Sequence, residues 1–501
     1  MYFFFRDVDE DEAVTRLRNI YDEFQKGFNA PPKVFARAPG RVNLIGEHID
    51  YEGYGVLPMA IVLDTVVAIR QNPDRQVITL RNTNSDAYGE LTFPICPDQT
   101  VDPDKHSWGN YVIGAYKGVF EHLRKNHPEL EPNPVGLDII VDGCVPTGSG
   151  LSSSAAIVCS SALAILSVLG VPRLKKGEVA EFTALAERYV GVISGGMDQA
   201  ISVMGKKGVA QLIEFNPVRA APVTIPSEAV FVIGNSMTVS NKAESATGRY
   251  NLRVVECRLA SAMMAKAMGA SKEDIISQYT TLKSIESLIE QWYSSKSIEN
   301  NISDPNWCVA AVLDFLPEGS CTRKSIEDTL GHAITELFNE EDVATNKVLS
   351  TFDTFKLYSR ALHVYKEKQR VYDFAQICAD TRYNSDKTMK LLGSLMDMSH
   401  ESCAQLYECS SPELDQLVKI AKEHGALGSR LTGAGWGGCT VSLVRRDNVD
   451  EFIKNVKSHY YDPLIQKGVL DEESMDVTLF SSMPATGAGV ILPNWCADVM
   501  P

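Results

Sequence analysis

A glycine- and serine-rich segment with the composition of a phosphate-binding loop occupies residues 145–156, which read V-P-T-G-S-G-L-S-S-S-A-A. Gly148 and Gly150 let the backbone approach a ligand where a Cβ atom would obstruct it. The small and aliphatic residues of 155–169 are typical of a buried helix. At the start of such a helix, unpaired N–H groups and the positive end of the helix dipole form a site for a phosphate. The alternative is a plain turn before a core helix.

The source of positive charge for this loop must lie elsewhere in the chain. The segment departs from the pattern G-x-x-x-x-G-K-[ST], because no lysine closes it. Three serines come shortly after the glycines, at Ser152, Ser153 and Ser154. We therefore expect a metal ion, held by a serine and a carboxylate, to supply the charge.

A second segment, A-P-G-R-V-N-L-I-G-E-H-I-D-Y at residues 38–51, combines charged and aliphatic side chains. Its polar members lie within ten positions and are Arg41, Glu47, His48 and Asp50. A solvated loop could carry these charges, but it would not need the aliphatic residues between them. Carboxylates and an imidazole in such a setting suit a ligand with many hydroxyl groups, which charged acceptors hold in a shaped site.

Two further glycine clusters accompany these segments. Asp198 follows Gly195 and Gly196 in an apolar stretch, where it is either the N-cap of a helix or a residue of the site. Residues 431–440, L-T-G-A-G-W-G-G-C-T, contain four glycines around one tryptophan. So many glycines indicate close backbone approach to a ligand or to a neighbouring loop.

The periodicity of the chain predicts a scaffold of mixed helices and strands that positions these segments. We expect helices at residues 12–28, 108–122, 155–169, 176–189, 250–268, 272–292, 352–374, 387–409 and 412–424. We expect strands at residues 34–38, 62–70, 77–81, 136–142, 209–215, 230–234 and 440–444. A proline-bearing stretch suggests a domain boundary that divides the chain into 1–222 and 223–501. Residues 293–340 are polar, acidic and irregular, which predicts a surface insertion in the second domain.

Composition excludes several classes of protein. The formal net charge of −16 over 501 residues argues against nucleic acid as a partner, whereas a nucleotide needs only local donors and a cation. Eleven scattered cysteines without C-x-x-C spacing indicate reduced thiols in a cytoplasmic protein. The N-terminus lacks the basic region of a targeting signal, and the longest apolar segment is too short to span a membrane. We therefore expect no membrane partner.

Three of these segments, at residues 38–51, 145–156 and 431–440, are motifs whose order and spacing resemble those of the GHMP small-molecule kinases. The segment at residues 38–51 resembles the signature of galactokinases. The segments S-G-G-M-D-Q, N-L-R-V-V-E-C-R and Y-E-C-S-S-P-E-L-D-Q-L are similar to the eukaryotic branch that contains plant-type galactokinases and N-acetylgalactosamine kinases. The resemblance extends from about Lys33 to about Pro484 and is weakest in residues 293–340. It implies an α+β, two-domain GHMP kinase fold with the active site in the cleft between the domains.

The resemblance also implies an activity and the residues that perform it. The reaction would be the ATP-dependent phosphorylation of the anomeric hydroxyl of galactose, with Mg²⁺ as cofactor. Asp198 would be the base and Arg41 its partner. The substrate-binding residues would be Arg41, Glu47, His48, Asp50, Gly196, Asp198 and Tyr250. The nucleotide-binding residues would be Trp108, Gly148, Ser149, Gly150, Leu151, Ser152, Ser153 and Ser154. The metal ligands would be Ser154 and Glu187.

Two alternatives remain open at this stage. An N-acetylgalactosamine kinase would share the fold and the chemistry, but that group tends to carry a smaller aromatic residue at the position of Tyr250. A non-catalytic relative that binds galactose and ATP and signals through a partner protein would be expected to lack part of the serine run or the acid. Both are present here. We expect a monomer, with galactose and ATP as its small-molecule partners.

Overall fold

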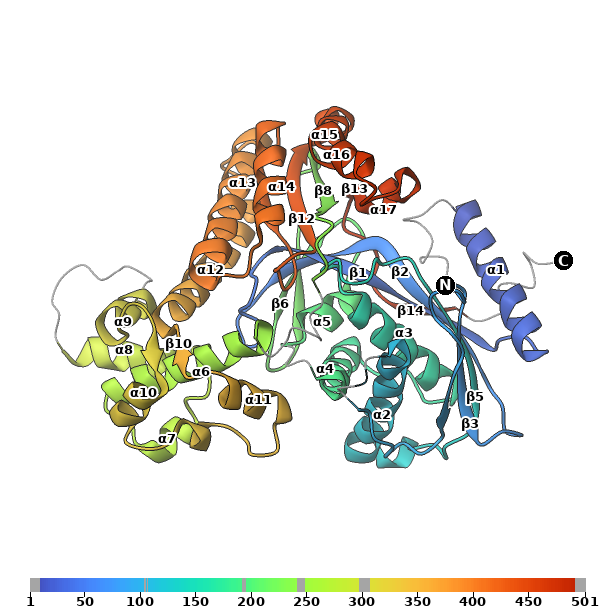
Figure 1. Ribbon diagram of the computed structural model, residues 1–501, viewed down its shortest axis with the longest axis horizontal. Coiled ribbons are helices and arrows are strands. Elements are labelled where there is room, and N and C mark those ends of the chain that lie inside the picture. Colours follow the sequence, from blue (N-terminus) through green and yellow to red (C-terminus); the bar gives the residue numbers. More distant parts are fainter. Residues whose placement is uncertain are drawn as a thin grey trace.

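Two β-sheets and a helical region carry the predicted motifs (Figure 1). The computed structural model describes residues 10–102, 105, 107–191, 195–240, 248–296 and 307–491, with the side chains of residues 10 and 11 left aside. The predicted strands and helices that carry the three motifs are present, so the motifs belong to a mixed α and β protein, as expected.

The first sheet has the strand order β14-β1-β2-β5-β3-β4. Its strands are β1 (Val34–Ile45), β2 (Leu57–Gln71), β3 (Val77–Asn82), β4 (Leu91–Pro94), β5 (Leu137–Gly143) and β14 (Gly489–Ile491). All its neighbours pair antiparallel except β3 and β5, which are parallel. Strand β1 is longer than the predicted 34–38, and every residue in it is buried. A strand buried on both faces needs helices on both faces.

Helices cover both faces of this sheet (Figure 1). Helix α1 (Glu10–Phe28) places Leu17, Ile20 and Phe24, spaced three and four apart, against one face. The helices toward the other face are α2 (Trp108–Asn126), α3 (Ser153–Val168), α4 (Lys176–Glu187) and α5 (Met197–Met204). Helix α3 packs between the sheet and its fellow helices, which explains why it is apolar nearly all round.

The second sheet has the strand order β11-β12-β8-β13 and is antiparallel throughout. Its strands are β8 (Ala229–Asn235), β11 (Gly428–Leu431), β12 (Cys439–Arg445) and β13 (Leu479–Ser482). The hairpin β6 (Ala210–Glu214) and β7 (Arg219–Val223) precedes it and contains the predicted proline-bearing stretch. Helices around this sheet include α14 (Pro412–Glu423), α15 (Val449–Val456), α16 (Asp462–Gln466) and α17 (Met475–Thr478). The chain then returns to the first sheet, where β14 pairs with β1.

A group of helices lies beside the two sheets, from the lower left to the upper left of Figure 1. Its members are α6 (Tyr250–Ala267), α7 (Lys272–Ser277), α8 (Glu286–Ser295), α9 (Trp307–Phe315), α10 (Arg323–Leu330), α11 (Val343–Thr351), α12 (Leu357–Ala379) and α13 (Ser385–Ser402). Two short strands, β9 (Cys321–Thr322) and β10 (Thr354–Phe355), pair within it. The long helices α12 and α13 pack on each other and on β1, so they reach the segment that carries the charged motif.

Two sequence-based expectations about this region are wrong. The predicted helix 272–292 is interrupted between α7 and α8, because backbone groups there bond to side chains elsewhere. Arg258 donates to the carbonyl oxygen of Tyr279, and the N–H of Leu282 donates to the Glu52 carboxylate. Residues 307–340 are not irregular either, because α9 and α10 bury apolar side chains such as Val312 and Ile326. Residues 297–306 lie outside the described part of the chain.

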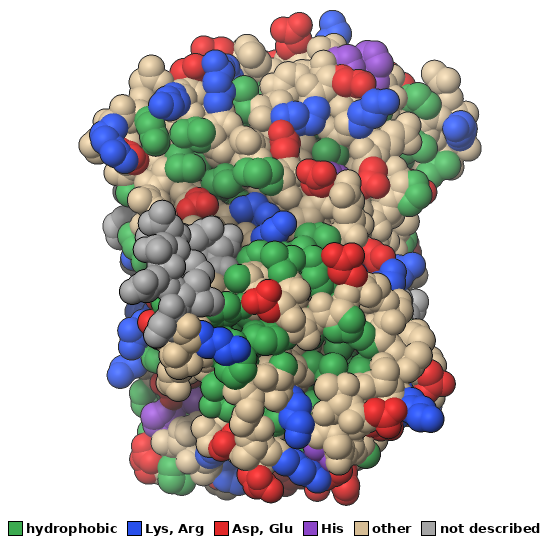
Figure 2. Space-filling model, turned by 90° about the vertical axis from the view of Figure 1, so that its left-hand side faces the viewer, with side chains coloured by type: hydrophobic (Ala, Val, Ile, Leu, Met, Phe, Trp, Pro, Cys, Tyr) green, Lys and Arg blue, Asp and Glu red, His purple; other side chains and the backbone are tan. Residues whose placement is uncertain are grey.

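The surface carries charges of both signs. On the face drawn in Figure 2, basic and acidic side chains are interspersed, and hydrophobic side chains gather across its middle. This mixture differs from the basic stripe that nucleic-acid-binding proteins present. Among the described helices, none combines the length and the apolar character needed to cross a membrane.

Candidate active site

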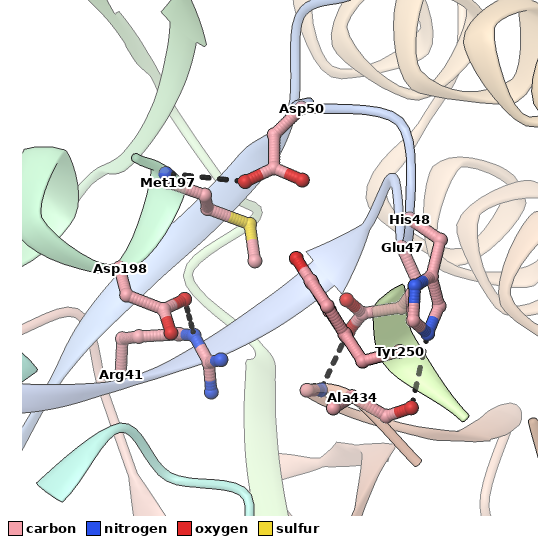
Figure 3. Close-up of a pocket in the computed structure, with 9 residues that line it drawn as sticks. Arg41, Glu47, His48, Asp50, Met197, Asp198, Tyr250 and Ala434 are labelled. Carbon is pink, nitrogen blue, oxygen red and sulfur yellow. Dashed lines mark hydrogen bonds and ion pairs between the residues drawn. The ribbon is translucent and has the colours of Figure 1, made fainter. Parts of the chain in front are cut away.

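A pocket brings together segments that are far apart in the sequence (Figure 3). The residues that line it are Arg41, Glu47, His48, Asp50, Met197, Asp198, Tyr250, Gly433 and Ala434. Strand β1 and the loop after it, α5, the start of α6 and the β11–β12 loop therefore meet at one place. Six of the predicted substrate-binding residues are in this set.

A buried ion pair joins Arg41 to Asp198. The Nε of Arg41 donates to Oδ1 of Asp198 over 2.8 Å, and each side chain is less than 8% exposed, at 5% and 7%. Burial lowers the pKa of Arg41, but the negative charges of Asp198 and Glu47 outweigh it and raise the pKa above its ordinary value. Arg41 therefore stays charged, and its charge favours the ionised form of the Asp198 carboxylate.

The same arginine contacts the predicted phosphate loop. Its Nη1 donates to the carbonyl oxygen of Gly150, and its backbone N–H donates to that of Leu151 over 3.0 Å. Two adjacent carbonyls of the loop are thus fixed to the residue that pairs with Asp198. Arg41 therefore contacts both the predicted base and the predicted phosphate loop.

Asp198 is not the N-cap of its helix, which settles one alternative left open by the sequence. It lies in the first turn of α5, and the capping position belongs to Gly196, which has φ of 98°. The carboxylate of Asp50 lies at this helix start, where Oδ2 accepts from the N–H of Met197 over 3.3 Å. A Cβ on Gly195 would come within 2.5 Å of the Asp50 carboxyl carbon, so only glycine allows this approach. Gly196 does not line the pocket described above.

Glu47 is held by the third glycine cluster, which is residues 431–440. Its Oε1 accepts from the N–H of Gly433 over 2.8 Å, and Nη1 of the buried Arg430 lies 3.6 Å away. Burial raises the pKa of Glu47 to about 7, against the opposing charges of Arg430 and Arg41. The carboxyl group is thus poised between its two protonation states near neutral pH.

Aromatic rings surround His48. The rings of Tyr250, Tyr407 and Trp436 have centroids 5.3, 4.8 and 5.6 Å from its own. In the neutral ring, Nε2 donates to the carbonyl oxygen of Ala434 over 2.9 Å, which leaves Nδ1 to accept from the Tyr51 hydroxyl over 3.1 Å. These contacts fix the imidazole as one wall of the pocket.

Tyr250 begins α6 and is only 6% exposed. Its pKa is raised well above the ordinary value, first by burial and then by four carboxylates, those of Asp50, Asp198, Glu187 and Glu47. The phenol therefore stays protonated at neutral pH. In Figure 3 its side chain lies between the Arg41–Asp198 pair and His48.

The predicted phosphate loop has an unusual backbone conformation where α3 begins. Ser152 caps α3 in the left-handed conformation with φ of 62°, which is unusual for a residue with a side chain. Its Oγ is buried and has no hydrogen-bond partner among the described residues. A strained residue with a buried, unpaired hydroxyl at a helix start indicates a place prepared for a ligand.

The third glycine cluster packs on this loop, which is one of the two close approaches that the sequence left open. Gly433 has φ of 84°, and a Cβ on it would lie 2.5 Å from the carbonyl oxygen of Gly150. The N–H of Ser240 donates to the carbonyl oxygen of Gly148 over 2.8 Å and closes the loop from another side. The glycines of the cluster thus serve loop-to-loop contact.

Glu187 is buried at the end of α4, and Oε2 accepts from Nε2 of Gln199 over 2.7 Å. Among the residues that the structure describes, no lysine or arginine is paired with it. Ser154 lies in the first turn of α3. Trp108 begins α2, where its ring lies edge-on to Tyr88. The assignment of these three residues to metal and nucleotide stays a prediction.

Sequence analysis missed the residues that support the charged motif from α12. Glu367 is fully buried, and Oε1 accepts from the N–H of Gly46 over 2.8 Å. Nε2 of His363 donates to the carbonyl oxygen of Glu47 over 3.0 Å, and burial lowers the pKa of His363 to about 4, so the ring stays neutral. The segment K-E-K-Q-R around Glu367 has the composition of a solvated helix face. Only the packing of α12 on β1 shows that Glu367 is buried.

Three family models match the chain, in the order of its motifs. They are the galactokinase galactose-binding signature at residues 22–71, the GHMP kinases N terminal domain at 110–206 and the GHMP kinases C terminal at 381–462. The galactokinase of Dictyostelium discoideum is 37% identical over 494 residues, which cover 95% of this chain and 94% of the relative. That of Saccharomyces cerevisiae is 36% identical over 502 residues, covering 94% and 93%.

The chain belongs to the galactokinase family. The solved structure of Lactococcus lactis galactokinase complexed with galactose shares its fold, with a TM-score of 0.68, 24% identity, and 95% of this chain and 99% of that chain covered. The fold class that the motifs implied, a GHMP kinase, is confirmed.

The three family models include most of the pocket residues but not all of them. Arg41, Glu47, His48 and Asp50 lie in the galactose-binding signature, and Asp198 lies in the N-terminal domain. Tyr250 and the supporting helix α12 lie outside all three matched segments. Their place at the site follows from the structure.

Proposed function

We propose that this protein is an ATP-dependent kinase that transfers a phosphoryl group to the anomeric hydroxyl of D-galactose and releases galactose 1-phosphate. Membership of the galactokinase family supports this activity. The observation that carries the assignment of residues is the buried Arg41–Asp198 pair, which contacts both the pocket and the phosphate loop. A sugar hydroxyl in the pocket would therefore lie near the Asp198 carboxylate and near the expected position of the phosphate.

Asp198 acts as the base in this proposal. An anomeric hydroxyl becomes a good nucleophile when its proton leaves, and a carboxylate within hydrogen-bond reach can accept that proton. Arg41 keeps the carboxylate ionised beforehand and stabilises negative charge on the phosphoryl group during transfer. Phosphoryl transfer depends chiefly on such positioning and charge stabilisation, so the rigid anchoring of Arg41 matters as much as its charge.

The nucleotide and its metal fit the residues at the start of α3. The unpaired hydroxyl of Ser152 and the N–H groups of the loop from Gly148 to Ser154 suit phosphate oxygens. Ser154 and Glu187 offer the oxygen ligands that Mg²⁺ prefers, and Glu187 has no competing cation among the described residues. Mg²⁺ would supply the positive charge that a lysine supplies in other phosphate loops.

Galactose is the sugar that this pocket favours over N-acetylgalactosamine. Tyr250 presents a buried aromatic wall whose phenol stays protonated, and the pocket is small. An acetamido group would add bulk to the sugar where Tyr250 leaves little room. One such clash is worth about 1–3 kcal/mol, or roughly 10- to 200-fold in kcat/KM.

A coupled assay of ADP release tests the activity directly. The purified chain is given ATP, Mg²⁺ and one of four substrates, namely galactose, N-acetylgalactosamine, glucose or mevalonate. We expect turnover with galactose to exceed turnover with each of the others. ADP release on none of them, with galactose and ATP still bound, would contradict the proposal and indicate a non-catalytic sensor.

A further inference from the structure

A cluster of two histidines and a glutamate lies away from the pocket, between the end of α2 and the start of α4. Its members are His122, His127 and Glu178, whose ligand atoms all lie within 4.8 Å of one another. His122 is in the last turns of α2, His127 is the C-cap residue of that helix, and Glu178 is in the first turn of α4. Figure 1 shows α2 and α4 side by side.

Both imidazoles already converge on one carboxylate oxygen. Nε2 of His122 donates to Oε1 of Glu178 over 2.8 Å, and Nε2 of His127 donates to the same atom. Partial burial alone would raise the pKa of Glu178, but the hydrogen bonds from His127 and His122 outweigh it and lower the pKa below its ordinary value. The two imidazole rings and the carboxylate therefore already face one point.

We propose that this cluster binds a divalent transition-metal ion, with Zn²⁺ as the best match, through Nε2 of His122, Nε2 of His127 and a carboxylate oxygen of Glu178. Two imidazoles and one carboxylate form a common three-residue ligand set for Zn²⁺, which leaves a fourth position for water. The side chains are 10%, 30% and 23% exposed, so an ion can reach them from solvent.

Coordination requires each neutral imidazole to move its proton from Nε2 to Nδ1. Acceptors for both protons are at hand. The side-chain amide of Asn126 lies 3.1 Å from Nδ1 of His122, and rotating that amide by half a turn presents its oxygen instead of its nitrogen. A carboxylate oxygen of Glu129 lies 3.9 Å from Nδ1 of His127. Such partners of metal-bound histidines are a regular feature of metal sites.

Packing also limits how far the ligands can turn. The ring of His122 stacks on Phe182 with centroids 4.8 Å apart and an interplanar angle of 28°. The position of His127 is fixed by its N–H bond to the carbonyl oxygen of Leu123 over 2.8 Å. The ion would therefore clip two helices together rather than gather three mobile side chains.

This site is separate from the proposed Mg²⁺ site. Glu178 and Glu187 lie nine positions apart on α4, which places them at opposite ends of the helix, about 13 Å apart along its axis. The expected consequence of the ion is therefore greater stability of the α2–α4 contact, with sugar phosphorylation left unchanged.

Calorimetric titration of the full chain with ZnCl₂, after chelator treatment and in millimolar Mg²⁺, tests the proposal. Mg²⁺ is present to compete for the carboxylates of the pocket. We expect one Zn²⁺ per chain, and at least about 100-fold weaker binding in Glu178→Gln and in His127→Gln, since loss of even a second-shell partner costs about 10- to 100-fold. The matched control is His459→Gln, because His459 also pairs with a histidine, His424, at 4.2 Å between centroids.

Three results would overturn the proposal. They are no binding at one ion per chain, equal affinity in wild type and Glu178→Gln, or a loss in His459→Gln as large as that in His127→Gln. Where a variant does not fold, the absorption spectrum of the wild type with Co²⁺ decides. An intense four-coordinate band supports the site, and the weak band of a six-coordinate ion contradicts it. Kinase turnover of His127→Gln should match wild type.

Discussion

Glu367 holds the loop at Gly46 and Glu47 in place through a buried charge, and removing that charge is the most informative test of how the pocket is built. Its Oε1 accepts from the N–H of Gly46 and from Ser399 Oγ over 2.8 and 2.6 Å, and Oε2 accepts from Nε of Arg370 over 2.7 Å. Burial alone would raise the pKa of Glu367, but Arg370 and Arg430 outweigh it and lower the pKa to about 2.

The size of the effect follows from this shift. The ordinary pKa is 4.5 and the folded value is about 2. A fall of about 2.5 units at about 1.36 kcal/mol each corresponds to ~3 kcal/mol of stability. The ionised form is the favoured one, so this contribution is present above the unfolded pKa and is lost as the pH falls through about 2. Glu367→Gln also leaves the buried Arg430 with less compensating charge, which points to a loss of about 3–5 kcal/mol at pH 7.

Urea unfolding at pH 7, followed by tryptophan fluorescence, measures the change. Glu367→Gln should lower the unfolding midpoint, and it should raise KM for galactose more than KM for ATP, because Gly46 and Glu47 lose their anchor. An unchanged midpoint together with unchanged KM for galactose would refute the reasoning.

The matched control is Glu52→Gln, at another fully buried glutamate. Burial raises the pKa of Glu52 to about 7, against its hydrogen bond from Leu282 and the charge of Arg258. The folded state therefore retains a proton that the unfolded state releases, and stability falls as the pH rises from about 4.5 to about 7. Glu52→Gln should match wild type near pH 5 and be more stable by up to ~3 kcal/mol near pH 8. Equal losses in both glutamine variants at pH 8 would mean that the two charges have no distinct roles.

Three further predictions concern the pocket and the phosphate loop. Glu187→Gln should reduce turnover severely at ordinary Mg²⁺ while galactose binding, measured by calorimetry, stays near wild type; wild-type turnover would remove Glu187 from the metal site. Wild-type kcat/KM should favour galactose over N-acetylgalactosamine by roughly 10- to 200-fold. Equal values for the two sugars in wild type would rule out crowding by Tyr250. Tyr250→Phe tests whether the ring or its hydroxyl sets that ratio. Arg41→Ala should slow turnover, and combining it with Asp198→Asn should cost less than the product of the single effects, because paired residues act as a unit.

Six of the nine residues that line the pocket were predicted before the structure, from the sequence and the family resemblance. Arg41, Glu47, His48 and Asp50 lie close together in one motif, and their residue types are unusual among aliphatic neighbours. Asp198 follows a glycine pair that marks a helix start. Local composition is enough for the four residues of the motif, because the chemistry and the backbone geometry that supports it lie in the same few residues. For Asp198 it left an N-cap and a site residue open, and the family resemblance favoured the site residue.

Residues that act across the fold could not be predicted in this way. Glu367 and His363 come from a helix more than 300 positions away from Gly46 and Glu47, and nothing in their own segment shows which surface they face. Arg430 directly precedes the third glycine cluster, and its buried contact with Glu47 depends on how β11 approaches β1. The break between α7 and α8 likewise depends on Glu52 and Arg258, which bond to backbone groups that a helix would otherwise use.

The central claim is that Asp198 accepts the proton of the anomeric hydroxyl, and Asp198→Asn tests it most directly. The variant keeps the size of the side chain and removes its charge and its capacity as a base. Calorimetry should show galactose and ATP bound nearly as in wild type, while turnover falls by about 10²–10⁴-fold, the range of general-base catalysis. Unchanged turnover, or loss of galactose binding in proportion to the loss of rate, would contradict the claim.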